Sequence, residues 1–226
     1  MTSEDFPHID VVRHARARRF LLRYDPIRDR LRLTLPRRAS ERAGLRWAAT
    51  QGDWVERQRS KRAEAIPLTP GARIPYRGRN LRLEWQAGAS RRVRLEGESL
   101  VTGGPVETAP RRYAQWLRAE ALRLLSEECA HFAALADVPV RGVAVGDARS
   151  RWGSCSADGR LRFSWRLVCA PDAVRRYVVA HEVAHRVHMN HGPAFRALEA
   201  ALVEGDVRAL STKLNALGPR LQRIGR

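Results

Sequence analysis

The motif His181-Glu182-Val183-Ala184-His185 constrains this chain more than any other feature. On an α-helix, residues four apart point the same way, so His181 and His185 can offer two imidazoles to a single cation. Glu182 is rotated by about 100° from His181, which places its carboxylate beside a bound metal rather than on it. In that position it can take a proton from a water molecule. The spacing therefore predicts a zinc hydrolase with two histidine ligands and a glutamate base.

A catalytic zinc site needs a third protein ligand, and the best candidate is His191. On a continuous helix His191 would point away from a metal held by His185. The sequence supplies a stop between the two, because Asn190 tolerates the left-handed conformation of helix C-termini and Pro193 disfavours helical geometry at Gly192. Pro193 can then begin the next helix, with Gly192 as its cap. We therefore expect the chain to turn back at His191 and to leave one coordination position open.

Four other residues compete for a place on the metal. Glu199 and Glu204 follow on the next expected helix, and one class of His-Glu-x-x-His enzymes uses a downstream glutamate as third ligand. We favour His191, because in that class the glutamate usually lies much further along the chain. His188 would compete for the same position and is expected to have a supporting or structural role. Cys155 is expected to be a small buried thiol, because three histidines suffice.

Composition indicates the compartment. The chain has 226 residues and no apolar run long enough to cross a membrane. Its first residues, Met1–Asp5, are polar and acidic, unlike a secretory signal. The three cysteines form no Cys-x-x-Cys pair. We therefore expect a cytoplasmic protein without a membrane partner.

The net charge of +18 predicts attraction to polyanions, DNA or RNA above all. Lys61 and Lys213 are the only lysines, however, and all other basic residues are arginines. Such a bias is typical of a GC-rich genome, and scattered arginines bind nothing in particular. Nucleic-acid binding and solvated surface charge both remain open from the sequence.

The N-terminal half has the pattern of strands and one helix. Residues 1–16 have the character of a loose arm. The runs 19–24 and 31–35 flank a turn and predict a β-hairpin, because the second run alternates strictly between apolar and polar residues. Ser40 can cap a helix that reaches about Arg62, with Trp47 and Trp54 on one face. Further short strands are expected at residues 80–85, 91–95 and 99–102.

Gly103, Gly104 and Pro105 mark the expected boundary between two regions, residues 1–104 and residues 105–226. A helix is expected from Pro110 to about Ala136, followed by a short strand at 143–145. The turn 157–160, which contains Asp-Gly, separates the runs 151–156 and 161–167 and predicts a second hairpin. The metal-binding helix begins after Pro171, and a helix containing Phe195 follows it.

The second hairpin gives a candidate substrate site. A strand beside a metal site, if its edge is open, can pair with an extended peptide and bind it with little sequence preference. Arg151 and Ser154 are the candidate substrate-binding residues. The alternative is that this segment is simply one strand of a sheet.

Several of these segments together resemble the YgjP-like metallopeptidase family. They are Arg-Trp-Gly-Ser-Cys-Ser at 151–156, Ala170-Pro171, the run from Tyr177 to His191, and Phe195. The order of elements is similar over nearly the whole chain. The resemblance implies a zincin-type core, with His181, His185 and His191 on Zn²⁺ and Glu182 as base. It also implies kinship with SprT-like proteases, some of which act on proteins bound to DNA.

We therefore expect an α+β protein in which a β-rich basic N-terminal region, 1–104, precedes a zincin-like catalytic domain, 105–226. Its expected activity is zinc-dependent hydrolysis of peptide bonds in peptide or protein substrates, including nucleic-acid-associated proteins. Three alternatives remain. One is a metal-dependent nucleoside triphosphate pyrophosphohydrolase, a label that some family members carry. The second is a basic nucleic-acid-binding protein with little peptidase activity, and the third is a structural zinc domain, in which Glu182 would have no role.

Overall fold

The structure is a computed structural model that describes residues 8–26, 28–60, 63–148 and 151–226. The chain divides into two compact units, residues 1–64 and 65–226. Six α-helices and three small sheets make up the described part, so the expectation of a mixed α+β protein is confirmed. No helix of the described residues is long and apolar enough to cross a membrane.

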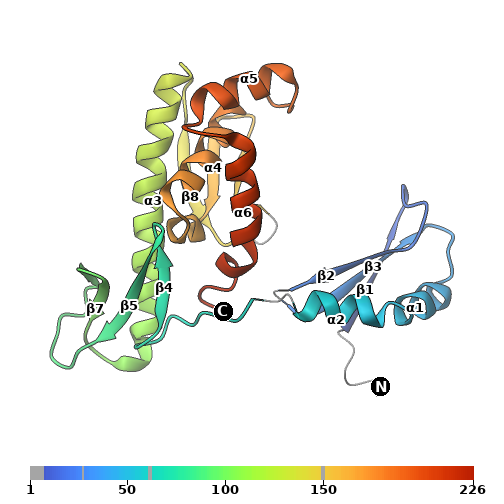
Figure 1. The fold of residues 1–226 in the computed structure, drawn as a ribbon, viewed down its shortest axis with the longest axis horizontal. Helices are drawn as coiled ribbons and strands as arrows, with labels where there is room; N and C mark the ends of the chain where they lie inside the picture. Colours follow the sequence, from blue (N-terminus) through green and yellow to red (C-terminus); the bar gives the residue numbers. More distant parts are fainter. Residues whose placement is uncertain (1–7, 27, 61–62, 149–150) are drawn as a thin grey trace. The chain divides into compact units, whose positions relative to one another are not determined.

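Unit 1 is a three-stranded sheet with two helices on one face (Figure 1). Its strands lie in the order β1-β3-β2 and its elements are β1 (His8–His14), β2 (Leu21–Asp25), β3 (Arg30–Pro36), α1 (Glu41–Ala49) and α2 (Gly52–Ser60). The predicted hairpin is confirmed as the antiparallel pair β2–β3. The apolar residues of β3 face the helices and form a small core with Ala48 and Val55, against which Trp47 and Trp54 pack.

Two expectations for unit 1 are wrong. Residues 8–14 are not part of a loose arm but a strand, β1, that pairs parallel with β3. Only that long-range pairing makes it a strand, because its own residues do not alternate clearly. The single expected helix is two helices, interrupted where the Thr50 hydroxyl donates to the carbonyl of Trp47 (2.7 Å) and Gly52 follows. Ser40 does cap the first of them, and the expected end at Arg62 lies outside the described residues.

Unit 2 begins with a four-stranded sheet in the order β4-β5-β7-β6. Its strands are β4 (Arg73–Tyr76), β5 (Arg79–Trp85), β6 (Arg94–Glu96) and β7 (Ser99–Thr102). The last three match the strands expected from the sequence, although β6 is shorter. The sequence did not predict β4, which contains Pro75. Proline is tolerated there because β4 is at the edge of the sheet.

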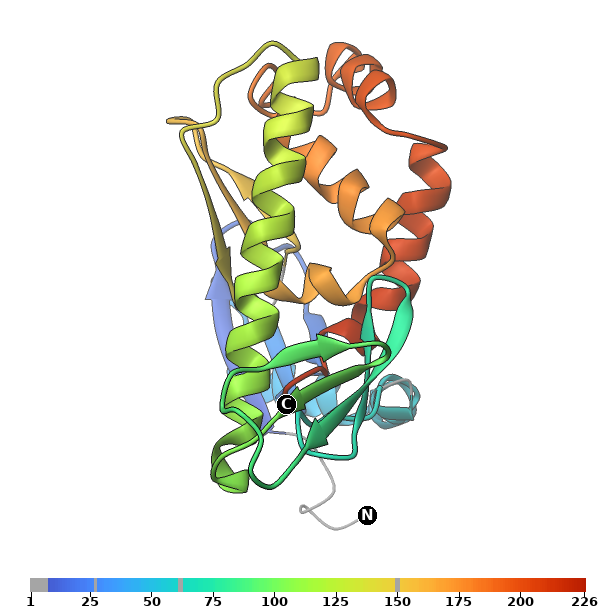
Figure 2. The ribbon, with the colours of Figure 1, turned by 90° about the vertical axis from the view of Figure 1, so that its left-hand side faces the viewer.

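The long helix α3 (Ala109–Leu135) runs past all other parts of unit 2 (Figure 2). The β4–β7 sheet lies near its N-terminal end, and α5 lies near its C-terminal end. The remaining elements are β8 (Gly142–Gly146), β9 (Gly153–Cys155), β10 (Arg160–Ser164), the 3₁₀ helix η2 (Trp165–Cys169), α4 (Asp172–Ala184), α5 (Pro193–Leu202) and α6 (Val207–Leu221). One continuous hydrophobic core joins the β4–β7 sheet, α3 and α4.

The division at residue 64 differs from the boundary expected at residue 104. The reason is packing, because Ile74, Leu81 and Leu83 of the β4–β7 sheet share one core with Tyr113 and Leu117 of α3. A glycine-rich loop separates the sheet from the helix in sequence, but their apolar faces cover each other. The loop therefore joins two parts of one unit.

The second predicted hairpin is confirmed as the antiparallel pair β9–β10, with Gly159 in the left-handed conformation of its turn (φ 88°). The second strand is shorter than expected. It ends at Ser164, whose hydroxyl accepts from the N–H of Arg166 and caps the helix η2. The apolar run therefore continues as a 3₁₀ helix and not as a strand.

Candidate metal centre

Helix α4 carries the first part of the site and ends within the motif. Its last residue is Ala184, and His185 is the C-cap, with its N–H still bonded to the carbonyl of His181 at 3.3 Å. A tight turn follows, in which His188 donates to Ala184 at 3.0 Å. His181, Glu182 and His185 therefore keep helical spacing, and the chain changes direction directly after them.

The loop that brings back His191 follows the predicted route in part. Pro193 opens α5 and Gly192 is its N-cap, as expected. Asn190, however, is not among the described residues with positive φ, so the expected left-handed stop is wrong. The helix had already ended at Ala184, and Asn190 instead uses its carbonyl to accept from Gly192 (2.8 Å) in a sharp turn.

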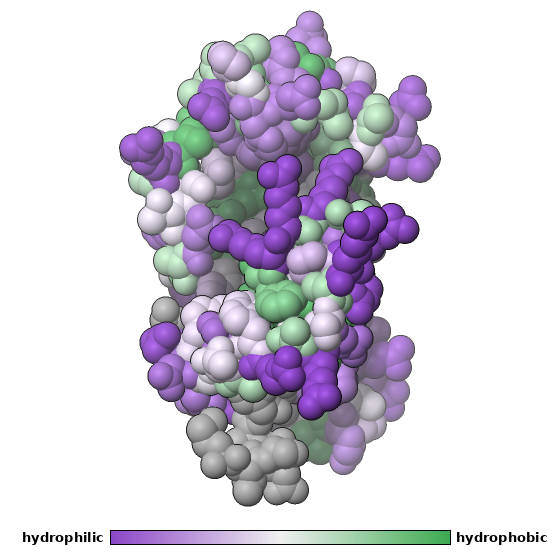
Figure 3. Space-filling view, turned by 90° about the vertical axis from the view of Figure 1, so that its right-hand side faces the viewer, coloured by the Kyte–Doolittle hydropathy of each residue, from purple (hydrophilic) through white to green (hydrophobic). Residues whose placement is uncertain are grey.

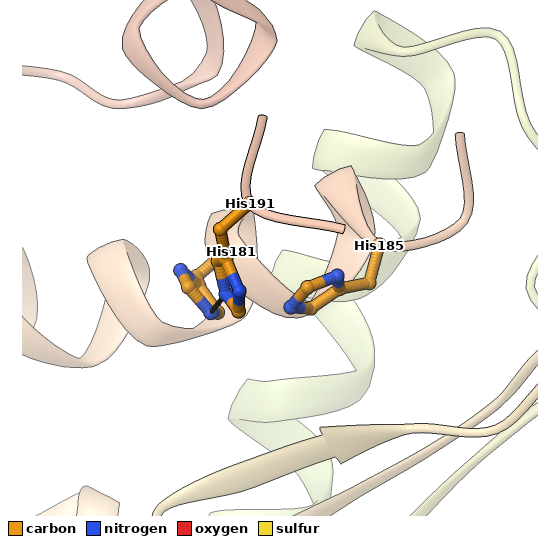
Figure 4. A group of neighbouring side chains, drawn as sticks. All are labelled: His181, His185 and His191. Atoms are coloured by element: carbon orange, nitrogen blue, oxygen red, sulfur yellow. Dashed lines mark hydrogen bonds between the residues drawn. The ribbon is translucent and has the colours of Figure 1, made fainter. Parts of the chain in front are cut away.

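Three imidazoles converge where this loop passes α4 (Figure 4). One nitrogen from each of His181, His185 and His191 lies within 4.8 Å of the others, and the Nε2 atoms of His181 and His191 are 3.2 Å apart. Two nitrogens bound to one tetrahedral zinc at about 2.0–2.1 Å would be about 3.3 Å apart. The observed spacing therefore fits a three-histidine metal site.

In two of these histidines, the second ring nitrogen, Nδ1, contacts another group of the protein. Nδ1 of His181 lies 2.7 Å from Oε1 of Glu199, and Nδ1 of His185 lies 3.1 Å from the carbonyl oxygen of His188. Such contacts fix the tautomer that leaves Nε2 free to bind a metal. Glu199 thus supports His181 and is not a member of the three-histidine group, and His188 contributes its main chain. The ion pair of Glu204 is with Arg176 (2.6 Å).

Phe195 forms the apolar floor of the site. Its buried ring packs against all three imidazoles, with centroid distances of 5.1 Å to His181, 4.6 Å to His185 and 4.7 Å to His191. Phe195 and Glu199 lie one turn apart on α5, so one face of this helix supplies both the apolar floor under the three imidazoles and the carboxylate that contacts His181. The spacing 191–195–199 was visible in the sequence, but we considered Glu199 only as a competing metal ligand and not as a partner of His181.

Burial affects the ionisation of two motif residues, the candidate base Glu182 and the candidate metal ligand His185. Desolvation raises the pKa of Glu182, although His181 and Arg151 oppose the change electrostatically. Desolvation also lowers the pKa of His185, which favours the neutral imidazole that metal binding requires. The carboxylate is therefore a stronger base than an exposed glutamate, at a position beside the three histidines.

Strand β9 passes directly over Glu182. A Cβ atom added to Gly153 would lie only 2.5 Å from Oε1 of Glu182, so a side chain here would displace Glu182 or the strand. Strand β9 is also at the edge of the β8-β10-β9 sheet. Trp152 and Ser156 bond to β10, and the alternation of an antiparallel ladder directs the main-chain groups of Gly153 and Cys155 to the open edge. The sequence did not single out Gly153, because only the packing of β9 on α4 makes it necessary.

The candidate substrate residues lie on or next to this strand. Ser154 alternates with Gly153, so its side chain points to the opposite face of the sheet from Glu182. Together with Arg151 and Arg162 it lines a separate pocket of about 250 Å³. Arg151 is close enough to Glu182 to affect its pKa. Cys155 is half-buried, as a thiol whose pKa is raised by burial.

Comparisons with known proteins give one finding. A family model described as YgjP-like, metallopeptidase domain, matches residues 19–216, which includes every residue of the site described above. Comparisons with curated proteins and with solved structures gave no match.

Proposed function

The chain belongs to the YgjP-like metallopeptidase family, and on that basis and the three-histidine geometry we propose that it is a zinc-dependent peptidase with a zincin-like core. The observation that carries the proposal is the convergence of His181, His185 and His191 beside the buried carboxylate of Glu182. Nitrogen ligands in this number leave one tetrahedral position open, which is the arrangement of catalytic zinc sites.

The residues then have separate tasks. The three histidines would hold the ion, and Glu199 and the carbonyl of His188 orient two of them. A bound zinc ion would supply a water of lowered pKa and would polarise the scissile carbonyl. Glu182 accepts the proton from the attacking water and passes it to the leaving amine. Its raised pKa suits both transfers, because a base that is too weak cannot take the proton.

The substrate we propose is an extended peptide that pairs with the edge of β9. The outward main-chain groups of Gly153 and Cys155 would bond to it as in β-strand addition. The absence of a side chain at Gly153 keeps the space between the peptide and Glu182 clear. Arg151 and Ser154 remain candidates for contacts with its side chains. The net charge of +18 would also attract proteins that are bound to nucleic acid, and we include them among the substrates.

The test separates metal binding from hydrolysis. We expect one zinc per chain by elemental analysis, and cleavage of an unfolded protein substrate by the zinc-loaded enzyme. Glu182→Gln should keep the zinc but lose cleavage, because an amide cannot accept the proton. His181→Ala should lose both. Full cleavage by Glu182→Gln, or full zinc in His181→Ala, would contradict the proposed roles. A nucleoside triphosphate offered in parallel tests the pyrophosphohydrolase alternative.

A further inference from the structure

The second face of the unit 1 sheet carries a cavity of about 590 Å³. Leu31, Leu33 and Leu35 of β3 point to the helices, so the residues between them point to the opposite face. The segment between β1 and β2 borders this face, and its residues line one side of the open cavity. The lining residues are Val12, His14, Arg16, Ala17, Arg18, Arg19, Leu21, Arg23, Arg32 and Thr34.

Five of the lining residues are arginines, and none is acidic. All five are exposed, and within the described part of the chain none forms a side-chain hydrogen bond or an ion pair. By contrast, Arg13 of the same unit donates to the carbonyls of Arg37 (3.1 Å) and Ala39 (2.7 Å). Its guanidinium has a structural role, whereas those of the cavity are free to bind a ligand.

Two cavity arginines are held at an electrostatic cost. Arg23 on β2 is directly opposite Arg32 on β3, and like charges at such positions repel each other. Asp10 is opposite Arg32 on the other side, but its carboxylate lies near His8 (3.4 Å) and Arg30 (3.7 Å), and it does not line the cavity. An anion bound between the two guanidiniums would remove the repulsion.

We propose that this cavity binds the phosphate backbone of a nucleic acid. Guanidinium groups match phosphate oxygens in bidentate geometry, and phosphate contacts dominate the affinity of proteins for nucleic acids. A protein partner would need aromatic or large apolar anchors, and the lining contains no Phe, Tyr or Trp. Val12, Ala17 and Leu21 offer a small apolar floor for sugars. Without aromatic rings to stack on bases, binding should not depend on sequence.

Charge alone does not identify the site, since the chain has 42 lysines and arginines. Figure 3 shows hydrophilic side chains at many places on the face that it draws. The experiment therefore compares two double variants that lose the same charge. Arg23→Gln/Arg32→Gln removes the opposed pair in the cavity. The control, Arg42→Gln/Arg46→Gln, removes two exposed arginines of α1, which packs on the other face of the sheet.

Binding of a fluorescent single-stranded oligonucleotide to the full-length chain is measured by anisotropy over a range of salt concentrations. The slope of log affinity against log salt should become shallower by about 1.4 in the cavity variant, since each phosphate contact contributes about 0.7 for single strands. Affinity at low salt should fall by about tenfold or more, and the control should match the wild type. Circular dichroism checks that both variants are folded.

Equal losses in the two variants would overturn the proposal in favour of diffuse surface charge. Competition by poly-glutamate as effective as that by the oligonucleotide, charge for charge, would overturn it in favour of an acidic protein partner. Neither measurement involves hydrolysis or metal, so the outcome is independent of whether the chain is a peptidase.

Discussion

Glu199 is outside the three-histidine group but should affect its affinity for zinc through His181. Its carboxylate lies 2.7 Å from Nδ1 of His181 and is almost fully buried. We expect Glu199→Gln to weaken zinc binding by about tenfold, because such supporting partners typically contribute 10- to 100-fold in affinity. His191→Ala should weaken it much more, since it removes a ligand. A zinc competition titration measures both.

The reverse ranking would assign the third ligand to Glu199. The sequence favoured His191 over Glu199 as the third ligand, and the structure adds a supporting role for Glu199 behind His181. That role follows from the contact between Glu199 and His181.

Gly153 gives a second prediction for single residues. In Gly153→Ala the new methyl group would meet Glu182 at 2.5 Å, so the carboxylate or strand β9 must shift. We expect peptidase turnover to fall at least tenfold, because misplacing a catalytic group by about 1 Å can cost about 100-fold. The zinc content should not change. Gly142→Ala is the control, because a Cβ at that position has no neighbour within 4 Å. Loss of zinc in Gly153→Ala would indicate general damage to the site.

At the scale of elements, a buried ion pair joins α4 to α3. Arg175 bonds to both carboxylate oxygens of Glu128 at 2.7–3.1 Å, and both side chains are almost fully buried. Glu128→Ala would leave a buried guanidinium with less compensation, at a cost of about 3–5 kcal/mol in the free energy of unfolding. Urea denaturation measures this cost. The double variant Glu128→Leu/Arg175→Met should recover most of the lost stability. No recovery would indicate that Glu128→Ala destabilises the protein through lost packing and not through the unpaired charge.

The first turn of α4 should make stability depend on pH. Burial opposes ionisation of Asp172, but hydrogen bonds from Arg77 and Arg175 outweigh it, so its pKa lies below the ordinary value. A carboxyl group with a lowered folded pKa stabilises the protein above its unfolded pKa, and this contribution is lost as the pH falls through the folded pKa. The effect should therefore appear below about pH 4.

Comparison with Asp172→Asn isolates this contribution. At neutral pH the wild type should be more stable by about 1 kcal/mol or less, because the carboxylate is 40% exposed and solvent screens the pair with Arg77. The difference should shrink as the pH falls below 4. A difference in the free energy of unfolding that stays constant down to pH 2 would show that the ion pairs do not contribute.

At the scale of the whole molecule, the two units have separate cores. One is built around β3, and the other joins α3, α4 and the β4–β7 sheet. We expect a fragment of residues 65–226 to fold alone and to bind zinc as the full-length chain does, because every residue of the metal site belongs to unit 2. Calorimetry of the full-length chain should show two unfolding transitions, and the fragment should retain only one. A fragment that is unfolded at room temperature would contradict this division.

What the sequence determined by itself is the chemistry that depends on local spacing. His181, Glu182 and His185 share one helical turn, so their relation follows from helix geometry alone. Gly192 and Pro193 open α5, and Asp-Gly forms the turn between β9 and β10, because these residues have strong conformational preferences of their own. Such features require no knowledge of distant residues.

Only the tertiary structure decided which distant groups meet. It brought Glu199 behind His181, placed Gly153 against Glu182 and paired β1 with β3 in parallel. It also moved the boundary between units from residue 104 to residue 64, because the β4–β7 sheet buries its apolar face on α3. These contacts join segments far apart in sequence, and packing of complementary surfaces selects them. No short pattern in the sequence specifies which segments pack together, because each apolar surface could cover several others until the core forms.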